Sequence, residues 1–225
     1  MATDGGIALR DVTVRYGRRV ALEAVTGQFA AGSLTAIVGA NGTGKSTLLA
    51  AMAGTIRLTS GRIDRPTTGR LAYLPQLAAL ATDYPMTVAE LIALGGWQAF
   101  GAFRAPGAAL REQAATAAMA VGLTGRLNRR IGELSPGELQ RALFARLIVQ
   151  DAGVILLDEP VAAIDAQTTS VLLDQIARWH REGRTVIAVL HDLELVRTRF
   201  PDTLVLARHC IAWGPTGSAL PAMAA

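Results

Sequence analysis

The chain of 225 residues has 22 basic and 18 acidic side chains, a formal net charge of +4 at pH 7, and 51% hydrophobic residues. This length and composition are typical of a globular protein with a substantial core in one or two domains. No uncharged apolar run reaches the roughly 18 residues that a membrane-spanning helix needs, and Met1 to Gly6 lack a secretion-signal pattern. A single cysteine, Cys210, excludes an internal disulfide and favours a reducing compartment.

The net positive charge is by itself compatible with binding to a nucleic acid. However, the arginines form only the short pairs Arg18-Arg19 and Arg129-Arg130, without interleaved aromatic residues or a recognisable reader motif. A net charge alone is weak evidence for such a partner. We therefore expect no nucleic-acid partner, and interpret the arginines mainly as a solvated surface.

The chain begins with the pattern of a small antiparallel sheet. Apolar and polar residues alternate over residues 12–25, with a turn at Gly17, which predicts a hairpin. Further along, residues 62–63 and 71–74 are expected to form short strands, separated by a turn-rich stretch. These elements predict an N-terminal antiparallel β-subdomain.

A glycine-rich segment, Gly39-Ala40-Asn41-Gly42-Thr43-Gly44-Lys45-Ser46-Thr47, lies between an expected strand, Leu34 to Val38, and an expected helix, Ser46 to Ala53. The glycines allow the backbone to turn tightly and point its N–H groups inward, and the helix adds its positive N-terminal end. The segment therefore has the pattern of a P-loop. In that pattern Lys45 reaches the β- and γ-phosphates of a nucleotide and Ser46 ligates Mg²⁺.

Composition supports this interpretation of Lys45. It is the only lysine in the chain, and the other 21 basic residues are arginines. A compact ammonium on a flexible stem fits among phosphates where a planar guanidinium does not. The alternative, a glycine-rich turn with a chance Lys-Ser pair, is disfavoured.

Residues 78–150 have the pattern of a helical insertion. Thr87-Val88-Ala89-Glu90 is a capping-box sequence that opens a helix through Leu94, and a second helix is expected over Ala108 to Val121. The intervening residues, 95–107, are predicted to be a loop. The rest of the chain returns to an α/β pattern with strands at 154–157, 185–190 and 203–212 and helices at 166–181 and 193–200.

Two carboxylates follow the buried strand expected at Val154 to Leu157. In an open α/β sheet the carboxyl ends of the strands form the ligand-binding edge, so Asp158 and Glu159 are expected beside the P-loop. There Asp158 would hold Mg²⁺, directly or through water, and Glu159 would act as the general base toward the attacking water. Carboxylates that merely cap a turn are the structural alternative.

Two further polar residues follow expected strands. His191 could contact a γ-phosphate and couple it to Glu159, or it could be a hydrogen-bonded structural histidine, and the sequence leaves both open. Gln76 follows Tyr73-Leu74-Pro75 and could reach Mg²⁺ or water.

Leu134-Ser135-Pro136-Gly137-Glu138-Leu139-Gln140 completes a set of motifs in a specific order. With the P-loop, Gln76, residues 154–160, Asp165 and His191, it resembles the ATP-binding-cassette (ABC) ATPases that drive membrane transporters. The resemblance covers essentially the whole chain. It implies an α/β P-loop NTPase fold in a single ABC ATPase domain, with residues 1–77 and 151–225 as the catalytic core and 78–150 as the helical signature subdomain.

The resemblance implies a homodimer in which two subunits sandwich two ATP molecules. Each P-loop would face the signature segment of the other subunit, so that Ser135, Pro136, Gly137 and Glu138 act in trans. The remaining assignments are Tyr16 as the aromatic that stacks on adenine, Gln76 as the Q-loop and a Mg²⁺ ligand, Asp165 as the D-loop and His191 as the switch histidine. ATP and Mg²⁺ are the implied cofactors.

The sequence departs from the family pattern in the signature and in the D-loop. Pro136 and Glu138 replace Gly and Gln of the usual Leu-Ser-Gly-Gly-Gln, and residues 161–165 lack the usual hydroxyl. Proline is acceptable at a first helical position, and Ser135 with Glu138 makes a capping box that competes for the Ser135 hydroxyl. Glu138 adds negative charge near an anionic ligand, which could weaken ATP sandwiching, and the sequence leaves the effect open.

The resemblance further implies a peripheral subunit on the cytoplasmic face of the membrane, with a separate transmembrane permease and, indirectly, a periplasmic or surface substrate-binding protein. Residues 84–88 and the short C-terminus after Gly214 resemble the zinc and manganese importers, with zinc favoured. Importers of iron chelates or cobalamin are similar there and stay open, as does a soluble ABC ATPase. The aromatics Tyr84, Trp97, Phe100 and Phe103 suit either a permease-docking groove or ordinary core.

Overall fold

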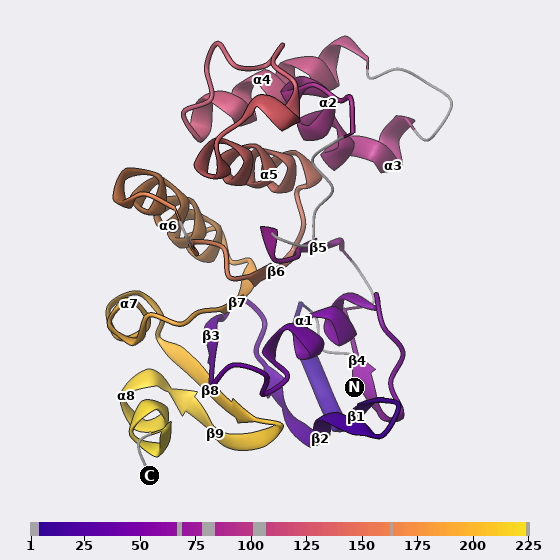
Figure 1. Cartoon of the computed structure of the whole chain (residues 1–225), viewed down its shortest axis with the longest axis vertical. Coiled ribbons are helices and arrows are strands. Elements are labelled where there is room, and N and C mark those ends of the chain that lie inside the picture. The colour runs from indigo at the N-terminus through magenta and orange to yellow at the C-terminus, as the bar shows by residue number, and fades with distance from the viewer. Residues whose placement is uncertain (1–4, 67–68, 78–83, 101–106, 163, 224–225) are drawn as a thin grey trace. The chain divides into compact units, whose positions relative to one another are not determined.

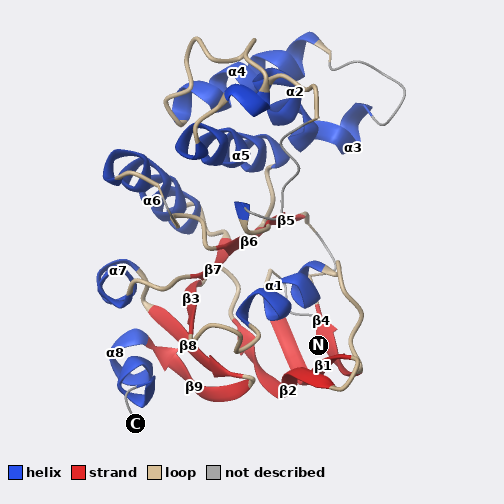
Figure 2. Ribbon diagram, in the orientation of Figure 1, coloured by secondary structure: helices blue, strands red, loops and turns tan. Residues whose placement is uncertain are grey.

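The computed structural model describes residues 5–66, 69–77, 84–100, 107–162 and 164–223. It divides the chain into two compact units. The core unit comprises Met1–Gln76, Gly153–Pro160 and Ile176–Ala225, and the helical unit comprises Leu77–Ala152 and Val161–Gln175. All named strands of the described chain belong to the core unit, and the helical unit is built from helices (Figure 2).

The larger sheet of the core unit has six strands in the order β5-β6-β7-β3-β8-β9. Their bounds are β5 Leu71–Leu74, β6 Val154–Asp158, β7 Thr185–Val189, β3 Leu34–Val38, β8 Asp202–Ala207 and β9 His209–Pro215. Strands β5 to β8 pair in parallel, and β9 pairs antiparallel with β8. Every residue of β3, β6 and β7 is buried, which explains their continuous apolar sequences.

The smaller sheet is the antiparallel β-subdomain, with the order β2-β1-β4. It consists of β1 Ile7–Tyr16, β2 Arg19–Phe29 and β4 Ser60–Asp64. Residues facing its buried side join α1 (Lys45–Ala53) and strands of the larger sheet in one apolar core (Figure 1). The predicted hairpin is confirmed, although its strands extend beyond residues 12–25, from Ile7 to Phe29.

The other helices of the core unit lie near the end of the chain. They are α7 Leu193–Arg199, α8 Thr216–Ala219 and the 3₁₀ helix η4 Leu220–Met223. Helix α6 (Ala166–Arg181) contains the boundary between the units, because Val161–Gln175 groups with the helical unit. The predicted division had placed the whole of 151–225 in the core.

Three helices of the helical unit pack against one another: α2 Val88–Ala93, α4 Ala108–Ala120 and α5 Pro136–Gln150 (Figure 1). A short 3₁₀ helix, η3 Ile131–Glu133, precedes α5. Both predicted capping boxes are present, with Thr87 and Glu90 at the start of α2 and Ser135 and Glu138 at the start of α5.

The prediction of a loop over residues 95–107 is wrong for its first part. The chain continues as η2 (Leu94–Gly96) and α3 (Trp97–Phe100), and residues 101–106 lie outside the described residues. The glycines that suggested a loop are instead needed for close packing. A Cβ on Gly95 would lie 2.3 Å from the Arg146 backbone oxygen in α5, and one on Gly96 would lie 2.5 Å from Leu110.

Two of the four aromatics in question are exposed, Tyr84 at 64% and Trp97 at 44%, so they are not ordinary core. Phe103 lies outside the described residues, as does the side chain of Phe100. Within the part of the chain that the structure describes, no helix has the length and hydrophobicity needed to cross a bilayer, and no three His, Cys, Asp or Glu side chains gather as a metal site.

Candidate active site

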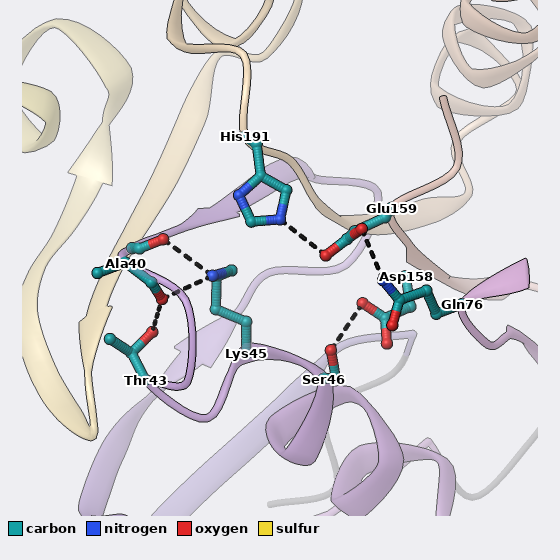
Figure 3. A network of polar contacts seen from close by, with 9 residues as sticks. Ala40, Thr43, Lys45, Ser46, Gln76, Asp158, Glu159 and His191 are labelled. Atoms are coloured by element: carbon teal, nitrogen blue, oxygen red, sulfur yellow. Dashed lines mark hydrogen bonds and ion pairs between the residues drawn. The ribbon is translucent and has the colours of Figure 1, made fainter. Parts of the chain in front are cut away.

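Lys45 is the centre of the P-loop, at the first residue of α1. The loop wraps around its side chain, which is 6% exposed. The Nζ atom donates hydrogen bonds to the backbone oxygens of Gly39 (2.8 Å) and Ala40 (2.9 Å), and the Thr43 hydroxyl also donates to Ala40 O (2.8 Å) (Figure 3). Burial lowers the pKa of Lys45, whereas the carboxylates of Glu159 and Asp158 oppose that shift. A cation is thus held where the loop turns.

Glycine is required in this loop because other backbone segments approach it closely. At Gly44, φ is +98°, and a Cβ would lie 2.4 Å from Ala21 O. At Gly39 a Cβ would lie 2.2 Å from Leu206 O in β8. The turn after β8 also braces the loop, because the Arg208 N–H donates to Thr43 O at 3.0 Å.

Asp158 is the last residue of β6 and is 2% exposed. Its Oδ1 accepts a hydrogen bond of 3.0 Å from the Ser46 hydroxyl. Burial raises the pKa of this carboxyl, against the hydrogen bond from Ser46 and the charge of Lys45, which lower it. The two oxygens from β6 and from the start of α1 are therefore side by side, as the sequence predicted.

Glu159 is held by two polar partners. Gln76 Nε2 donates to Glu159 Oε2 at 2.8 Å, and His191 Nε2 lies 2.7 Å from Glu159 Oε1 (Figure 3). The backbone of Glu159 has a φ of +51°, which is uncommon for a residue other than glycine. Such left-handed residues persist where the surrounding structure fixes them, and they cluster at functional sites.

His191 is positioned by the residues on both sides of it. Leu190 N donates to Ile37 O at 3.2 Å, which continues the pairing of β7 with β3. Asp192 is the N-cap of α7, and its Oδ1 accepts from the N–H groups of Glu194 (2.9 Å) and Leu195 (3.0 Å). The backbone that carries the imidazole is thus fixed at the strand-to-helix turn.

The predicted residues of the core unit come together at one edge of the larger sheet. Gln76 follows β5, Asp158 ends β6, His191 follows β7 and the P-loop follows β3, and these four parallel strands are neighbours. This carboxyl edge is the expected ligand-binding edge of an open α/β sheet. It opens into a cleft of about 740 Å³ lined by Tyr16, Arg19, Ala21, Asn41, Gly42, Gly44, Lys45, Ser46, Thr47, Gln76, Glu159 and His191.

Sequence reasoning missed Arg19 and Ala21, which line this cleft from β2. A Cβ on Gly42 would lie 3.4 Å from an Arg19 guanidinium nitrogen, so this cation is next to the P-loop. No motif marks Arg19, since its position depends on how the hairpin folds over the loop. Gly39, Ala40 and Thr43 are not among the lining residues and contribute through the contacts already described.

The remaining predicted residues belong to the helical unit. Ser135 Oγ accepts from Glu138 N at 3.2 Å, and Glu138 Oε2 accepts from Ser135 N at 3.0 Å. Pro136 is the first residue of α5. Asp165 Oδ1 accepts from Thr168 N at 2.8 Å, which caps α6 and lowers the Asp165 pKa. A Cβ on Gly137 would be 3.3 Å from Asp165 Oδ2, so the signature segment and the D-loop carboxylate are neighbours within one chain.

Known proteins with similar sequences identify the family of the chain. The chain matches the ABC transporter family over residues 22–162. It is 38% identical, over 92% of its length and 89% of the relative's, to the manganese transport system ATP-binding protein MntB of Listeria monocytogenes. It is 36% identical, over 97% of its length and 84% of the relative's, to the zinc transport system ATP-binding protein TroB of Treponema pallidum.

Among solved structures, an ABC transporter in an inward-facing conformation superposes on the chain with a TM-score of 0.83 at 25% identity. The match covers 94% of this chain and 84% of the other. Sequence, fold and the arrangement of the cleft point to one conclusion: the chain belongs to the ABC transporter family, as an ATP-hydrolysing subunit.

Proposed function

We propose that this chain is the ATPase subunit of an importer for a divalent metal ion, zinc or manganese, and that it works as a homodimer beneath a separate permease. The observation that carries the ATPase part is the convergence of Lys45, Ser46, Asp158 and Glu159 at one sheet edge. The names of the relatives, which include both manganese and zinc transport systems, support the cargo.

The cleft suits a nucleoside triphosphate. Its volume of about 740 Å³ lies within the range of roughly 300–1,000 Å³ typical of small-molecule sites. Tyr16 is 53% exposed at its mouth and can offer a ring face to adenine. In this proposal the Lys45 ammonium exchanges its two carbonyl partners for oxygens of the β- and γ-phosphates.

The donor set also fits Mg²⁺, a hard cation that prefers oxygen ligands. The Ser46 hydroxyl and the Asp158 carboxylate lie 3.0 Å apart, and Gln76 supplies an amide oxygen from the neighbouring strand. These three residues would hold the ion. When bound, it would neutralise charge on the β- and γ-phosphates during transfer.

Glu159 is the proposed general base. Its carboxylate takes a proton from the attacking water while the water oxygen forms a bond to the γ-phosphorus and the bond to the ADP oxygen breaks. His191 would keep this carboxylate oriented through the 2.7 Å contact and would lie near the γ-phosphate. Gln76 holds the second carboxylate oxygen of Glu159 through a hydrogen bond. Displacement of Gln76 would therefore release one oxygen of the general base.

The signature segment would act on the nucleotide of the other copy. The capping bond uses the Ser135 oxygen as an acceptor, and a hydroxyl that accepts can still donate its proton. Capping and γ-phosphate binding in trans are therefore compatible. Gly137 would bring the backbone close to the phosphate, with Pro136 fixing the first turn of α5.

The helical unit would contact the permease, and Tyr84 and Trp97 are exposed on it. In this arrangement the chain is peripheral at the cytoplasmic face of the membrane. Metal selection would lie in the permease and in a substrate-binding protein outside the membrane.

The test is elemental analysis of cells that lack this gene, grown in chelator-limited medium. Zn, Mn and Fe are measured together, in cells complemented with wild type or with Glu159→Gln. We expect one of zinc or manganese to fall selectively and to recover only with wild type. Unchanged zinc and manganese would overturn the metal cargo and favour a chelate importer or a soluble ABC ATPase.

A further inference from the structure

The signature segment contains a negative charge where it would approach an anionic ligand. Glu138 is the third residue of α5, and its side chain is 16% exposed. A carboxylate near the terminal phosphate of ATP disfavours binding, because like charges in a poorly solvated site repel. A neutral glutamine at this position would avoid that cost and still complete the capping box.

The structure gives this carboxylate a specific partner. Glu138 Oε1 forms an ion pair with Arg126 Nε at 3.1 Å, while Oε2 accepts from the Ser135 backbone N–H at 3.0 Å. Both carboxylate oxygens are therefore occupied by donors. These hydrogen bonds and the charges of Arg126 and Arg129 hold the pKa of Glu138 below its usual value, so the group is ionised at neutral pH.

Arg126 itself is fixed by the chain around it. Its N–H donates to Leu123 O at 3.1 Å, and its carbonyl oxygen accepts from Arg129 N at 3.0 Å, so that it lies within consecutive turns between α4 and η3. Its side chain is 43% exposed. A guanidinium has five N–H donors, and one donor suffices for Glu138.

We propose that Arg126 is a positioning residue for the ATP bound in trans: it neutralises Glu138 and directs that carboxylate away from the γ-phosphate, so that Ser135 and Gly137 can bind it. This inference rests on the proposed function, because it assumes that the signature segment contacts ATP of a second copy. Arg126 therefore compensates for the unusual residue in the signature.

The experiment measures ATP-dependent dimerisation of the full chain in a Glu159→Gln background, where bound ATP is not turned over. Arg126→Gln, Glu138→Gln and the combination of both are compared by sedimentation across a titration of ATP with Mg²⁺. Arg111→Ala on α4 is the matched control, because it removes an exposed positive charge of the same unit. Binding of a fluorescent ADP to the monomer and thermal unfolding are measured in parallel.

We expect Arg126→Gln to raise the ATP concentration for half-dimerisation by about three- to tenfold, the effect of losing one partly exposed charge pair. Arg126→Lys should largely restore it, and Arg111→Ala should not change it. With Glu138→Gln in place, Arg126→Gln should change it less than about twofold, since the charge to be neutralised is gone. ADP binding to the monomer should be the same in every variant.

Equal effects of Arg126→Gln in the presence and absence of the Glu138→Gln substitution would overturn the inference, and so would no effect at all. If Arg126→Gln does not fold, Arg126→Met is compared in the same way, and equal effects with and without Glu138→Gln would again overturn the inference. If the Glu159→Gln parent binds ADP but never dimerises with ATP, the proposed trans arrangement fails, and this inference fails with it. A parent that dimerises while Arg126 proves irrelevant leaves the proposed function intact.

Discussion

Gly44→Ala should damage the P-loop more than the same change at another left-handed glycine. The new Cβ would meet Ala21 O at 2.4 Å and Leu22 Cδ2 at 2.7 Å. One of the obstacles is backbone of β2, which cannot rotate away. Alanine at a φ of +98° also costs about 1–3 kcal/mol of backbone strain.

Gly183 is the matched control. It has a φ of +79°, and a Cβ there would meet nothing within 4 Å, so that Gly183→Ala carries strain without a clash. We expect Gly183→Ala to cost about 1 kcal/mol, and Gly44→Ala to cost about 3 kcal/mol or more because strain and clash add.

Thermal unfolding provides the assay. For a chain of this size each kcal/mol corresponds to a shift of about 2–4 °C in Tm. Gly44→Ala should therefore lower Tm by about 6–12 °C and weaken ATP binding, whereas Gly183→Ala should lower Tm by about 2–4 °C and bind ATP normally. Equal Tm shifts for the two variants would refute the reasoning from close approach.

Three further changes test individual contacts. Asp158→Asn should raise the free energy of unfolding at pH 7, because burial raises the pKa of this carboxyl; such a group stabilises the fold below its unfolded pKa and loses that stability as pH rises. The gain in the free energy of unfolding, measured with urea, should shrink as the pH is lowered toward 4. A gain that grows as the pH falls would contradict the expected direction of the pH dependence. Arg65→Ala should cost about 1 kcal/mol, because Arg65 caps the end of α1 through bonds to Met52 O (2.6 Å) and Ala51 O (2.7 Å); unchanged urea unfolding would count against this cap. Thr216→Val should cost about 1–3 kcal/mol, because the buried hydroxyl donates to Phe200 O (2.6 Å) and pairs with Thr203 (2.8 Å); Thr216→Ser, which keeps the hydroxyl, should be much milder.

Sequence alone predicted the features that depend on short stretches of chain. The P-loop, the strand that delivers Asp158, and the capping boxes at Thr87 and Ser135 are all local patterns, and the structure contains each of them. The meeting of Gln76, Glu159 and His191 could also be anticipated, because each follows a parallel strand of one sheet.

Features that depend on packing between distant segments could not be predicted. The helical conformation at Gly95 and Gly96 exists because α5 and Leu110 approach too closely for larger residues. In the sequence, these glycines had instead favoured a loop.

The same limit explains the arginines that were overlooked. Arg19 reaches the P-loop, and Arg126 reaches Glu138, only through the tertiary fold. In a chain with 21 arginines no local pattern distinguishes these two from the others.

The most direct test of the proposed chemistry is the hydrolysis rate of purified Glu159→Gln compared with wild type and with Glu112→Gln, an exposed carboxylate on α4. Both variants should fold and bind ATP like wild type. We expect Glu159→Gln to lower kcat by about 10²–10⁴, the usual contribution of a general base, and Glu112→Gln to leave it unchanged. Hydrolysis at the wild-type rate by Glu159→Gln would contradict the assignment of Glu159 as the base.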